Sequence, residues 1–135
     1  VRLRDGHDVT IAAIGNRVTP ALEAAKLLEA MGVSAGVLNM RFVKPLDRDL
    51  LLQALDKSPR LVTVEDNVIQ GGFGSAVLEA LTEAGASAKV LRLGIPDQFV
   101  SHGTQDQLYA QLRIDAPGIA ARTAEWLGTK VPARA

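Results

Sequence analysis

One stretch near the middle of the chain, residues 61–77, restricts the possible folds more than any other. It reads Leu-Val-Thr-Val-Glu-Asp-Asn-Val-Ile-Gln-Gly-Gly-Phe-Gly-Ser-Ala-Val. The apolar, β-branched start is typical of a buried strand, and the glycine cluster allows a sharp turn. From Gly74 onward the apolar residues recur at helical spacing. These seventeen residues therefore predict a strand, a tight turn and a helix N-terminus.

The same alternation of strand and helix recurs along the whole chain. Short apolar runs predict strands, and apolar residues at helical spacing predict the helices that follow them. The predicted strands are 9–14, 34–40, 60–65 and 88–93, and the predicted helices are 18–31, 45–57 with Asp47 as N-cap, 74–84, 104–112 and 116–127. The strands carry apolar residues on both faces, as parallel strands covered by helices do. We therefore predict an α/β fold, a three-layer α/β/α domain with a mostly parallel sheet.

Composition limits the domain organisation and the partners. The chain has 135 residues, of which 47% are hydrophobic, enough for one domain with its own core. Its 15 basic residues balance 15 acidic ones, which does not suggest a nucleic-acid surface or a polybasic membrane patch. No apolar run approaches the roughly 20 residues of a membrane-spanning helix. We expect one domain at 1–128, a C-terminal tail at 129–135, and neither nucleic acid nor membrane as a partner.

Cysteine and histidine usage excludes several kinds of site. With no cysteine, the chain has no disulfide and no cysteine metal site, which fits a reducing cytosol. Two histidines far apart in sequence are too few for an ordinary zinc site. The first residues are mixed and charged, so no signal peptide is visible, and the missing initiator Met suggests a piece of a longer chain. We expect a cytoplasmic protein and no metal bound by this chain.

Ligands of such sheets bind outside the carboxyl ends of the strands. Four segments are expected there: 15–17, 39–41, 65–67 and 94–97. Together with the glycine loop and the loop before residue 104, they supply the candidates for an interface or a ligand loop. These candidates are Arg41, Glu65, Asn67, Gly71, Gly72, Gly74, Ser75, Asp97 and His102.

The glycine loop has two possible roles. Gly72 and Gly74 match the first two glycines of the dinucleotide fingerprint, but Val77 stands where the third is required. No Gly-Lys-Ser/Thr follows, so the phosphate-binding loop of nucleotide hydrolases is excluded as well. The amides at the helix start could still bind an anion. We favour the second role, in which the glycines permit a sharp turn and close packing of the helix on the strand.

The acidic residues and the loop histidine could carry catalysis. Glu65 and Asp66 are adjacent on an extended segment, so they point to opposite faces and cannot form an acid/base pair. Glu65 could be buried with a raised pKa, or its carboxylate could accept hydrogen bonds from amides near Gly71. His102, near Asp97, could be a general base or a structural or interface residue. We favour the structural roles, and a hydrolase that uses Glu65 and His102 stays an alternative.

Two further features have simple structural explanations. Arg41 and Lys44 flank one aromatic residue, and a solvated loop explains them better than a phosphate contact does, because no other basic residues cluster nearby. Trp126 is expected to anchor the last helix in the core or at a subunit contact.

Taken together, the segments resemble the C-terminal domain of the 1-deoxy-D-xylulose-5-phosphate synthases, which are transketolase-like enzymes. The resemblance covers nearly the whole chain in order. It is carried by 8–11 with Gly15, by 20–25, by Asn-Met-Arg-Phe-Val-Lys-Pro-Leu-Asp at 39–47, by Val-Thr-Val-Glu-Asp-Asn at 62–67 with the glycine loop 71–77, and by Leu-Gly-Ile-Pro-Asp-Gln-Phe at 93–99 with His-Gly at 102–103.

This resemblance implies a function for the whole enzyme. Enzymes of this family condense pyruvate with glyceraldehyde 3-phosphate and release CO2, with thiamine diphosphate and Mg²⁺ as cofactors. They feed isoprenoid, thiamine and pyridoxal synthesis, and they are bacterial homodimers with three domains. The cofactors and the catalytic acid belong to the first two domains. The family's Gly-Asp-Gly…Asn motif for diphosphate and metal is absent here, and residues 5–8 do not supply it.

For this chain the resemblance implies a supporting role. We expect no catalytic, cofactor-binding or metal-binding residue in it, and contacts with the two N-terminal domains of the same polypeptide and with a second subunit. A regulatory ligand at the strand ends is a further possibility. The implied sheet has five strands with one antiparallel at an edge, and the fifth is expected in 1–3 or 99–100. The alternative is a free-standing α/β module that binds a small anion at 71–75.

Overall fold

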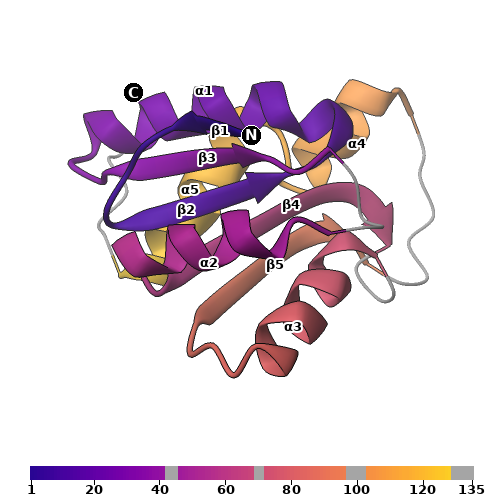
Figure 1. The fold of residues 1–135 in the computed structure, drawn as a ribbon. Coiled ribbons are helices and arrows are strands. Elements are labelled where there is room, and N and C mark those ends of the chain that lie inside the picture. Colours follow the sequence, from indigo (N-terminus) through magenta and orange to yellow (C-terminus); the bar gives the residue numbers. More distant parts are fainter. Residues whose placement is uncertain (42–45, 69–71, 97–102, 129–135) are drawn as a thin grey trace.

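The computed structural model describes residues 1–41, 46–68, 72–96 and 103–128. Its centre is a five-stranded sheet in the order β1-β3-β2-β4-β5 (Figure 1). The strands are β1 (Arg2–Arg4), β2 (Val9–Ala13), β3 (Ala35–Asn39), β4 (Arg60–Val68) and β5 (Lys89–Ile95). Every neighbouring pair is parallel except β1 with β3, which is antiparallel at the edge. The predicted fold class is confirmed, and the fifth strand lies at the first of its two predicted places.

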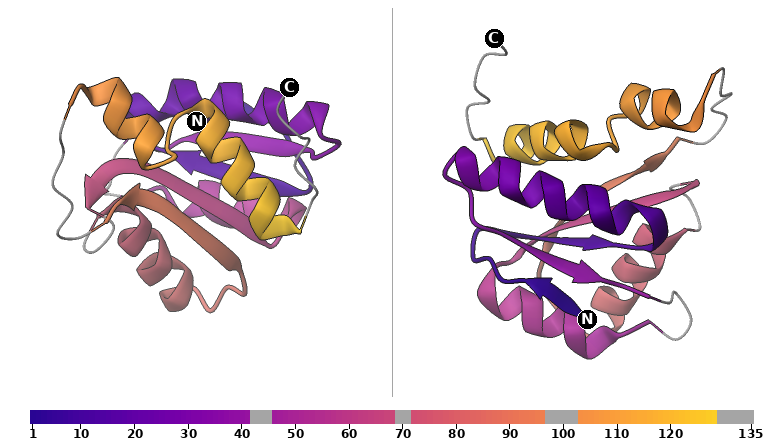
Figure 2. Two further views of the ribbon diagram at one scale, coloured as in Figure 1. Left: turned by 180° about the vertical axis from the view of Figure 1, so that it is seen from behind. Right: turned by 90° about the horizontal axis from the view of Figure 1, so that it is seen from above.

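Helices cover both faces of the sheet. They are η1 (Gly15–Arg17), α1 (Val18–Ala30), α2 (Arg48–Lys57), α3 (Phe73–Glu83), α4 (Gln105–Gln111) and α5 (Ala116–Leu127). Figure 2 shows α1 and α5 on one face, and α2 and α3 on the other. Within the described ranges, no helix combines the length and the apolar character needed to cross a membrane.

Two strands run past their predicted ends: β5 reaches Ile95 instead of residue 93, and β4 extends further still. β4 continues to Val68, beyond the predicted end at residue 65. The register with β5 shifts after Val64, and pairing resumes between Val68 and Ile95. Glu, Asp and Asn have low strand propensity, so the sequence predicted that the strand ends here. In the structure the pairing with β5 becomes irregular at this position but does not stop. The extension matters because it places Asp66 in the sheet next to Glu65.

The hydrophobic core has two parts, one on each face of the sheet. The first joins Ile11, Val37 and Val62 to Leu28 of α1 and Ile119 of α5. The second lies beneath α2 and α3 and contains Leu38, Leu51, Leu61, Phe73 and Val77. Trp126 is half-buried and packs against the first part, which confirms that it anchors α5 in the core. This double burial explains why the strands are apolar on both faces.

Local capping sets the helix starts. Asp47 caps α2 as predicted, because its Oδ1 accepts a hydrogen bond from the backbone N–H of Leu50 at 3.1 Å. Asp115 accepts from the N–H of Gly118 at 3.0 Å and caps α5 in the same way. Thr104 and Gln107 form a reciprocal capping box at the start of α4.

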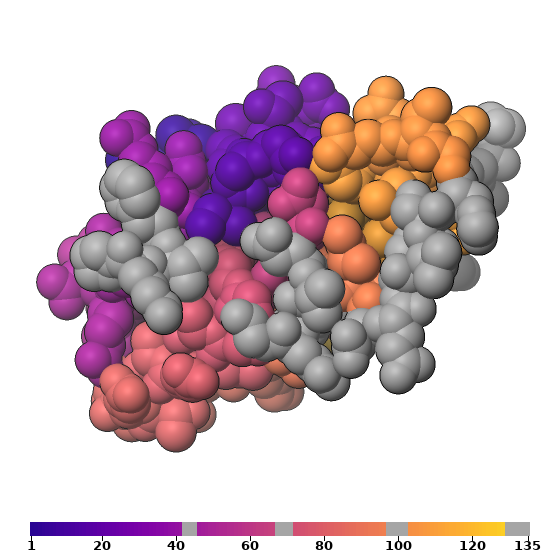
Figure 3. Space-filling view, turned by 90° about the vertical axis from the view of Figure 1, so that its right-hand side faces the viewer, coloured from indigo at the N-terminus to yellow at the C-terminus, as the bar shows by residue number. Residues whose placement is uncertain are grey.

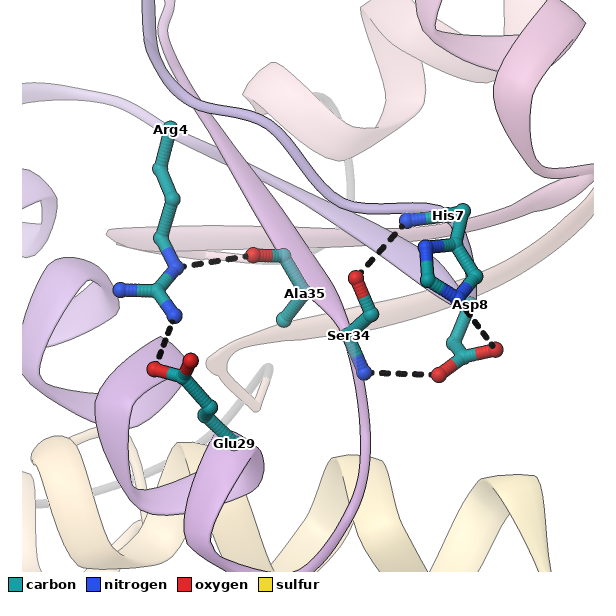
Figure 4. A network of polar contacts seen from close by, with 6 residues as sticks. All are labelled: Arg4, His7, Asp8, Glu29, Ser34 and Ala35. Atoms are coloured by element: carbon teal, nitrogen blue, oxygen red, sulfur yellow. Dashed lines mark hydrogen bonds and ion pairs between the residues drawn. The ribbon is translucent and has the colours of Figure 1, made fainter.

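A polar network ties the edge strand β1 to α1 and to the segments that lead into β2 and β3 (Figure 4). Arg4 donates from Nη2 to Glu29 Oε2 of α1 at 2.6 Å and from Nε to the carbonyl of Ala35 at 3.2 Å. Nearby, Ser34 Oγ accepts from the backbone N–H of His7 at 3.1 Å, and the His7 ring is exposed.

This grouping of serine and histidine beside Asp8 is not a hydrolase triad. A triad requires the imidazole to accept the serine proton. Here the hydroxyl of Ser34 faces the backbone of His7, and Asp8 Oδ2 accepts from the N–H of Ser34 at 2.7 Å. The network therefore holds β1, β2 and β3 together.

Candidate functional site

The carboxyl ends of β2 and β4 form a topological switch point, because the connections that leave these two strands run to opposite sides of the sheet. From β2 the chain crosses through α1 to β3 on one side, and from β4 through α3 to β5 on the other. Open α/β sheets bind ligands at such a switch point. Figure 3 looks onto this edge, where the orange helix α4 lies beside the indigo start of α1. The residues gathered here form the candidate site.

A polar cluster occupies one side of this point. It consists of Asn16 and Arg17 after β2, Asp66 in β4, and Tyr109 in α4. Asn16 Nδ2 donates to Asp66 Oδ2 at 3.0 Å and to Tyr109 Oη at 2.9 Å. Tyr109 Oη donates in turn to Asp66 Oδ2 at 3.2 Å. We call these four residues the switch-point cluster.

Arg17 lies beneath the others in this cluster, with only 5% of its surface exposed. Its Nε donates to Asn16 Oδ1 at 3.0 Å, and its Nη1 donates to the carbonyl of Ile114 at 2.7 Å. The guanidinium carbon stacks 3.6 Å from the centre of the Tyr109 ring, a cation–π contact. Burial lowers the pKa of Arg17 from its usual value, because the low-dielectric surroundings disfavour the charged form.

Glu65 points to the other face of the sheet and is fully buried. Its Oε1 accepts from the N–H of Phe73 at 2.9 Å, and its Oε2 accepts from the N–H of Gly74 at 2.7 Å. The carboxylate thus binds the first amides of α3, which otherwise have no partner in the helix. Burial raises the pKa of Glu65, while the two amide bonds and the Arg92 guanidinium act in the opposite direction.

The partners of the two acids confirm that they point to opposite faces. Glu65 is bound by α3, and Asp66 by Asn16 and by Tyr109 of α4. The internal carboxylate also occupies the amides of Phe73 and Gly74 that an external anion would need. The Glu65 carboxylate was predicted to accept hydrogen bonds from amides near Gly71. It does accept two amide hydrogen bonds, and their donors are Phe73 and Gly74.

The close packing predicted for the glycine loop is present at Gly74. A Cβ on this residue would lie 2.9 Å from Thr63 Oγ1 and 3.1 Å from Arg92 Cδ. Gly72 is the N-cap residue of α3. Ser75, in the first turn, accepts a long hydrogen bond from Arg92 Nη1 at 3.5 Å. Glycine at position 74 therefore lets the helix approach β4 and β5 closely enough for Glu65 to reach its amides.

Of the other candidate residues, Arg41 and the backbone of Asn67 lie within the described ranges. Arg41 is exposed just after β3, and Asn67 continues the backbone of β4. Gly71, Asp97 and His102 lie outside the described residues, so a hydrolase that uses Glu65 and His102 stays untested. Its proposed acid, however, is already bound by two amides.

Sequence reasoning named none of the four residues of the switch-point cluster as a candidate. The segment 15–17 was placed at the strand ends, but Tyr109 lies 93 positions from Asn16 in the sequence. The only sequence signal for it is that the chain's one tyrosine falls in a helix, and tyrosine hydroxyls usually find a partner when buried.

The described residues contain no cluster of side chains suited to a metal ion. In 1–41, 46–68, 72–96 and 103–128, no three His, Cys, Asp or Glu side chains come together as metal ligands would. Both carboxylate oxygens of Glu65 and Oδ2 of Asp66 accept hydrogen bonds from donors of the chain itself. We therefore assign none of these described residues to a metal ion.

Comparison with known proteins identifies relatives of the chain. The family model "Transketolase, C-terminal domain" matches residues 1–119. A 1-deoxy-D-xylulose-5-phosphate synthase of Geobacter sulfurreducens is 55% identical over 95% of this chain but only 20% of its own length. One from Geobacter metallireducens is 57% identical over 89% of this chain and 19% of its own. The chain therefore spans about a fifth of these relatives.

Solved structures with the same fold agree. One match is a structure described as a split gene transketolase, inactive β4 tetramer. The match covers 97% of this chain and 43% of the other chain, with a TM-score of 0.86 and 37% identity. The match to a transketolase from Pichia stipitis covers 94% of this chain and 18% of the other chain, with a TM-score of 0.65 and 21% identity. This second match shows a similar fold and no more. The resemblance inferred from the sequence segments is confirmed.

Proposed function

Because this chain belongs to the transketolase C-terminal domain family, we propose that it is the C-terminal domain of a 1-deoxy-D-xylulose-5-phosphate synthase. The observation that carries this proposal is the 55% identity to the Geobacter sulfurreducens synthase over 95% of this chain, set against 20% of that protein. Such identity across a whole domain fits the same position in the same kind of enzyme. The transketolase relationship alone would leave the substrate open.

The whole enzyme would be a transferase that condenses pyruvate with glyceraldehyde 3-phosphate and releases CO2. Thiamine diphosphate would supply the carbanion chemistry, and Mg²⁺ would hold its diphosphate. The product would serve isoprenoid, thiamine and pyridoxal synthesis in the cytoplasm of a bacterium. Because the described residues offer no metal ligand cluster, we assign both cofactors to the two N-terminal domains.

The role of this chain would be structural. It would pack against the N-terminal domains and contribute to a homodimer, and it would be inactive when isolated. Two observations support this role. The buried acid Glu65 fastens α3 to the sheet and is not free for proton transfer. The split gene transketolase that shares this fold is itself described as an inactive tetramer.

Calorimetry tests the assignment of the cofactors. When thiamine diphosphate is titrated into this chain with excess Mg²⁺, we expect no saturable heat. The full-length Geobacter sulfurreducens synthase, measured under the same conditions, is the positive control. Tight, Mg²⁺-dependent binding to this chain alone would contradict the assignment of the cofactors to other domains.

A further inference from the structure

We propose that the segment 104–113, which contains α4, is a latch: it leaves the switch point and unfolds as a separate unit while the rest of the domain stays folded. The side chain of Tyr109 holds it closed. In the open form Asn16, Arg17 and Asp66 become accessible to water at the carboxyl ends of β2 and β4. This inference goes beyond the proposed function, because it concerns a conformational change of this chain alone and does not depend on synthase activity.

The first observation is that one side chain seats α4 on the domain. Tyr109 is the only buried residue of this helix and is 6% exposed, while Leu108 is half-buried and the other residues of α4 are exposed. Each of the other α-helices in the described ranges buries at least two residues. Segments with few buried apolar contacts open at a lower free energy than the core does. We therefore expect α4 to open before the rest of the domain.

The second observation is that both ends of α4 are closed by residues of its own segment. The capping box lies at 104–107. At the other end the N–H of Arg113 donates to the carbonyl of Ala110 at 3.1 Å, and the N–H of Ile114 donates to the carbonyl of Tyr109 at 2.9 Å. This is the Schellman arrangement, in which Arg113 adopts the left-handed φ of 60°. These bonds fasten the helix to its own flanks and not to the sheet.

The third observation is the polar character of the seat beneath Tyr109. Its hydroxyl accepts from Asn16 Nδ2 at 2.9 Å and donates to Asp66 Oδ2 at 3.2 Å, and the centre of its ring lies 3.6 Å from the guanidinium carbon of Arg17. Water can replace both hydrogen bonds when the helix leaves. Opening also returns water to the guanidinium of Arg17, a residue that is only 5% exposed in the closed form. Such a seat costs less to open than an apolar one of the same area.

The flanks of α4 define where the opening ends. Gly103, before the helix, has a φ of 121°, which glycine adopts without strain. Ile114, after the helix, is fully buried, and its carbonyl accepts from Arg17 Nη1 at 2.7 Å. The chain can therefore turn at Gly103 and stays fixed at Ile114. A helix as short as α4 is unstable alone in water, so it unfolds once it leaves the seat, and its amide protons then exchange.

Hydrogen exchange followed by NMR over a series of urea concentrations tests the latch. The reporters in the segment are the amides of Leu108 and Leu112, which donate to carbonyls within it. In the wild-type chain we expect these two amides to exchange through an opening that hardly depends on urea. The amides of 61–64 in β4 should exchange only through global unfolding, with a steep dependence on urea. The Nε–H of Arg17, which donates to Asn16 Oδ1 at 3.0 Å, reports whether the cluster is uncovered.

Three variants separate local opening from global unfolding. Tyr109→Phe removes the hydroxyl and keeps the ring, so it should speed exchange of the latch amides and of Arg17 Nε–H about tenfold. Val77→Ala, in the second part of the core, should speed the 61–64 amides at least about tenfold and leave the latch amides within about twofold, because the open form keeps that part of the core. Gln111→Ala, at an exposed position of α4, is the matched control and should change neither set by more than about twofold.

Four outcomes would overturn the inference. They are latch amides with the same urea dependence as 61–64, latch amides that Val77→Ala speeds as much as 61–64, latch amides that Tyr109→Phe leaves unchanged, and latch amides of the wild type that exchange as fast as in an unfolded peptide. If Tyr109→Phe fails to give a dispersed spectrum, Asp66→Asn replaces it, because it weakens the same hydrogen bond from the other side.

Discussion

Replacing Glu65 with alanine is expected to lower the free energy of unfolding by about 2 to 4 kcal/mol. The substitution leaves the N–H groups of Phe73 and Gly74 without their acceptors, at a site where the Glu65 side chain is fully buried. It also leaves a small cavity between β4 and α3. Urea denaturation followed by circular dichroism measures this change.

Two variants separate the role of the carboxylate from side effects. Glu79→Ala makes the same substitution at an exposed position of α3, and we expect it to change stability by less than about 0.5 kcal/mol. Glu65→Gln keeps the side-chain volume but places an NH2 group against one amide donor, so it should also destabilise. If Glu65→Ala is as stable as Glu79→Ala, the carboxylate does not fasten α3.

The same residue predicts a pH dependence. Burial raises the pKa of Glu65 above its ordinary value of 4.5. Between the two values the folded chain binds this proton more than the unfolded chain does, so stability falls as pH rises through that window. The difference in unfolding free energy between wild type and Glu65→Gln should therefore shrink as pH rises from below 4.5 through the raised pKa, and then level off. A difference that grows with pH would contradict this direction.

The second large effect is expected at Gly118, near the start of α5. Replacing a helical glycine with alanine normally stabilises a protein by about 0.5 to 1 kcal/mol. At Gly118 an added Cβ would lie 2.5 Å from the Cα and 2.7 Å from the carbonyl oxygen of Arg113. These are backbone atoms of a residue with a left-handed φ of 60°, so they have little freedom to move. We expect Gly118→Ala to destabilise the chain by about 2 to 4 kcal/mol.

The sign of this effect is its clearest feature. Pro117→Ala, at the exposed neighbouring position, serves as the control and should stay within about 1 kcal/mol of wild type. Both variants are compared by thermal unfolding. A Gly118→Ala variant with unchanged or increased stability would show that α5 does not pack tightly on the turn after α4.

Features set by local chemistry could be predicted from the sequence. Asp47 lies three residues before Leu50, a spacing that determines the cap at the start of α2. The apolar character of the strands on both faces predicted the parallel sheet and its two layers of helices. The end of β4 was predicted too early, because Asp66 and Asn67 have weak strand propensity, whereas the strand continues past them and pairs with β5 again at Val68.

The switch-point cluster could not be predicted in the same way. Arg17 reaches the carbonyl of Ile114 across 97 positions of sequence, and no local pattern encodes that contact. Arginine also has a high prior for exposure, so nothing in the sequence marks this one as buried. The bond from Glu65 to the amides of α3 spans only eight and nine residues. The sequence therefore allowed the structural role of Glu65 to be predicted, but not which two amides it binds.

The most direct test of the central claim is a chimera in which this chain replaces the C-terminal fifth of the Geobacter sulfurreducens synthase. We expect the chimera to condense pyruvate with glyceraldehyde 3-phosphate within about tenfold of the parent rate, a difference of about 1.4 kcal/mol in the barrier. The parent truncated at the same point should lose this activity. A folded chimera as inactive as the truncated enzyme, or a truncated enzyme with full activity, would contradict the assignment of this chain as the enzyme's supporting domain.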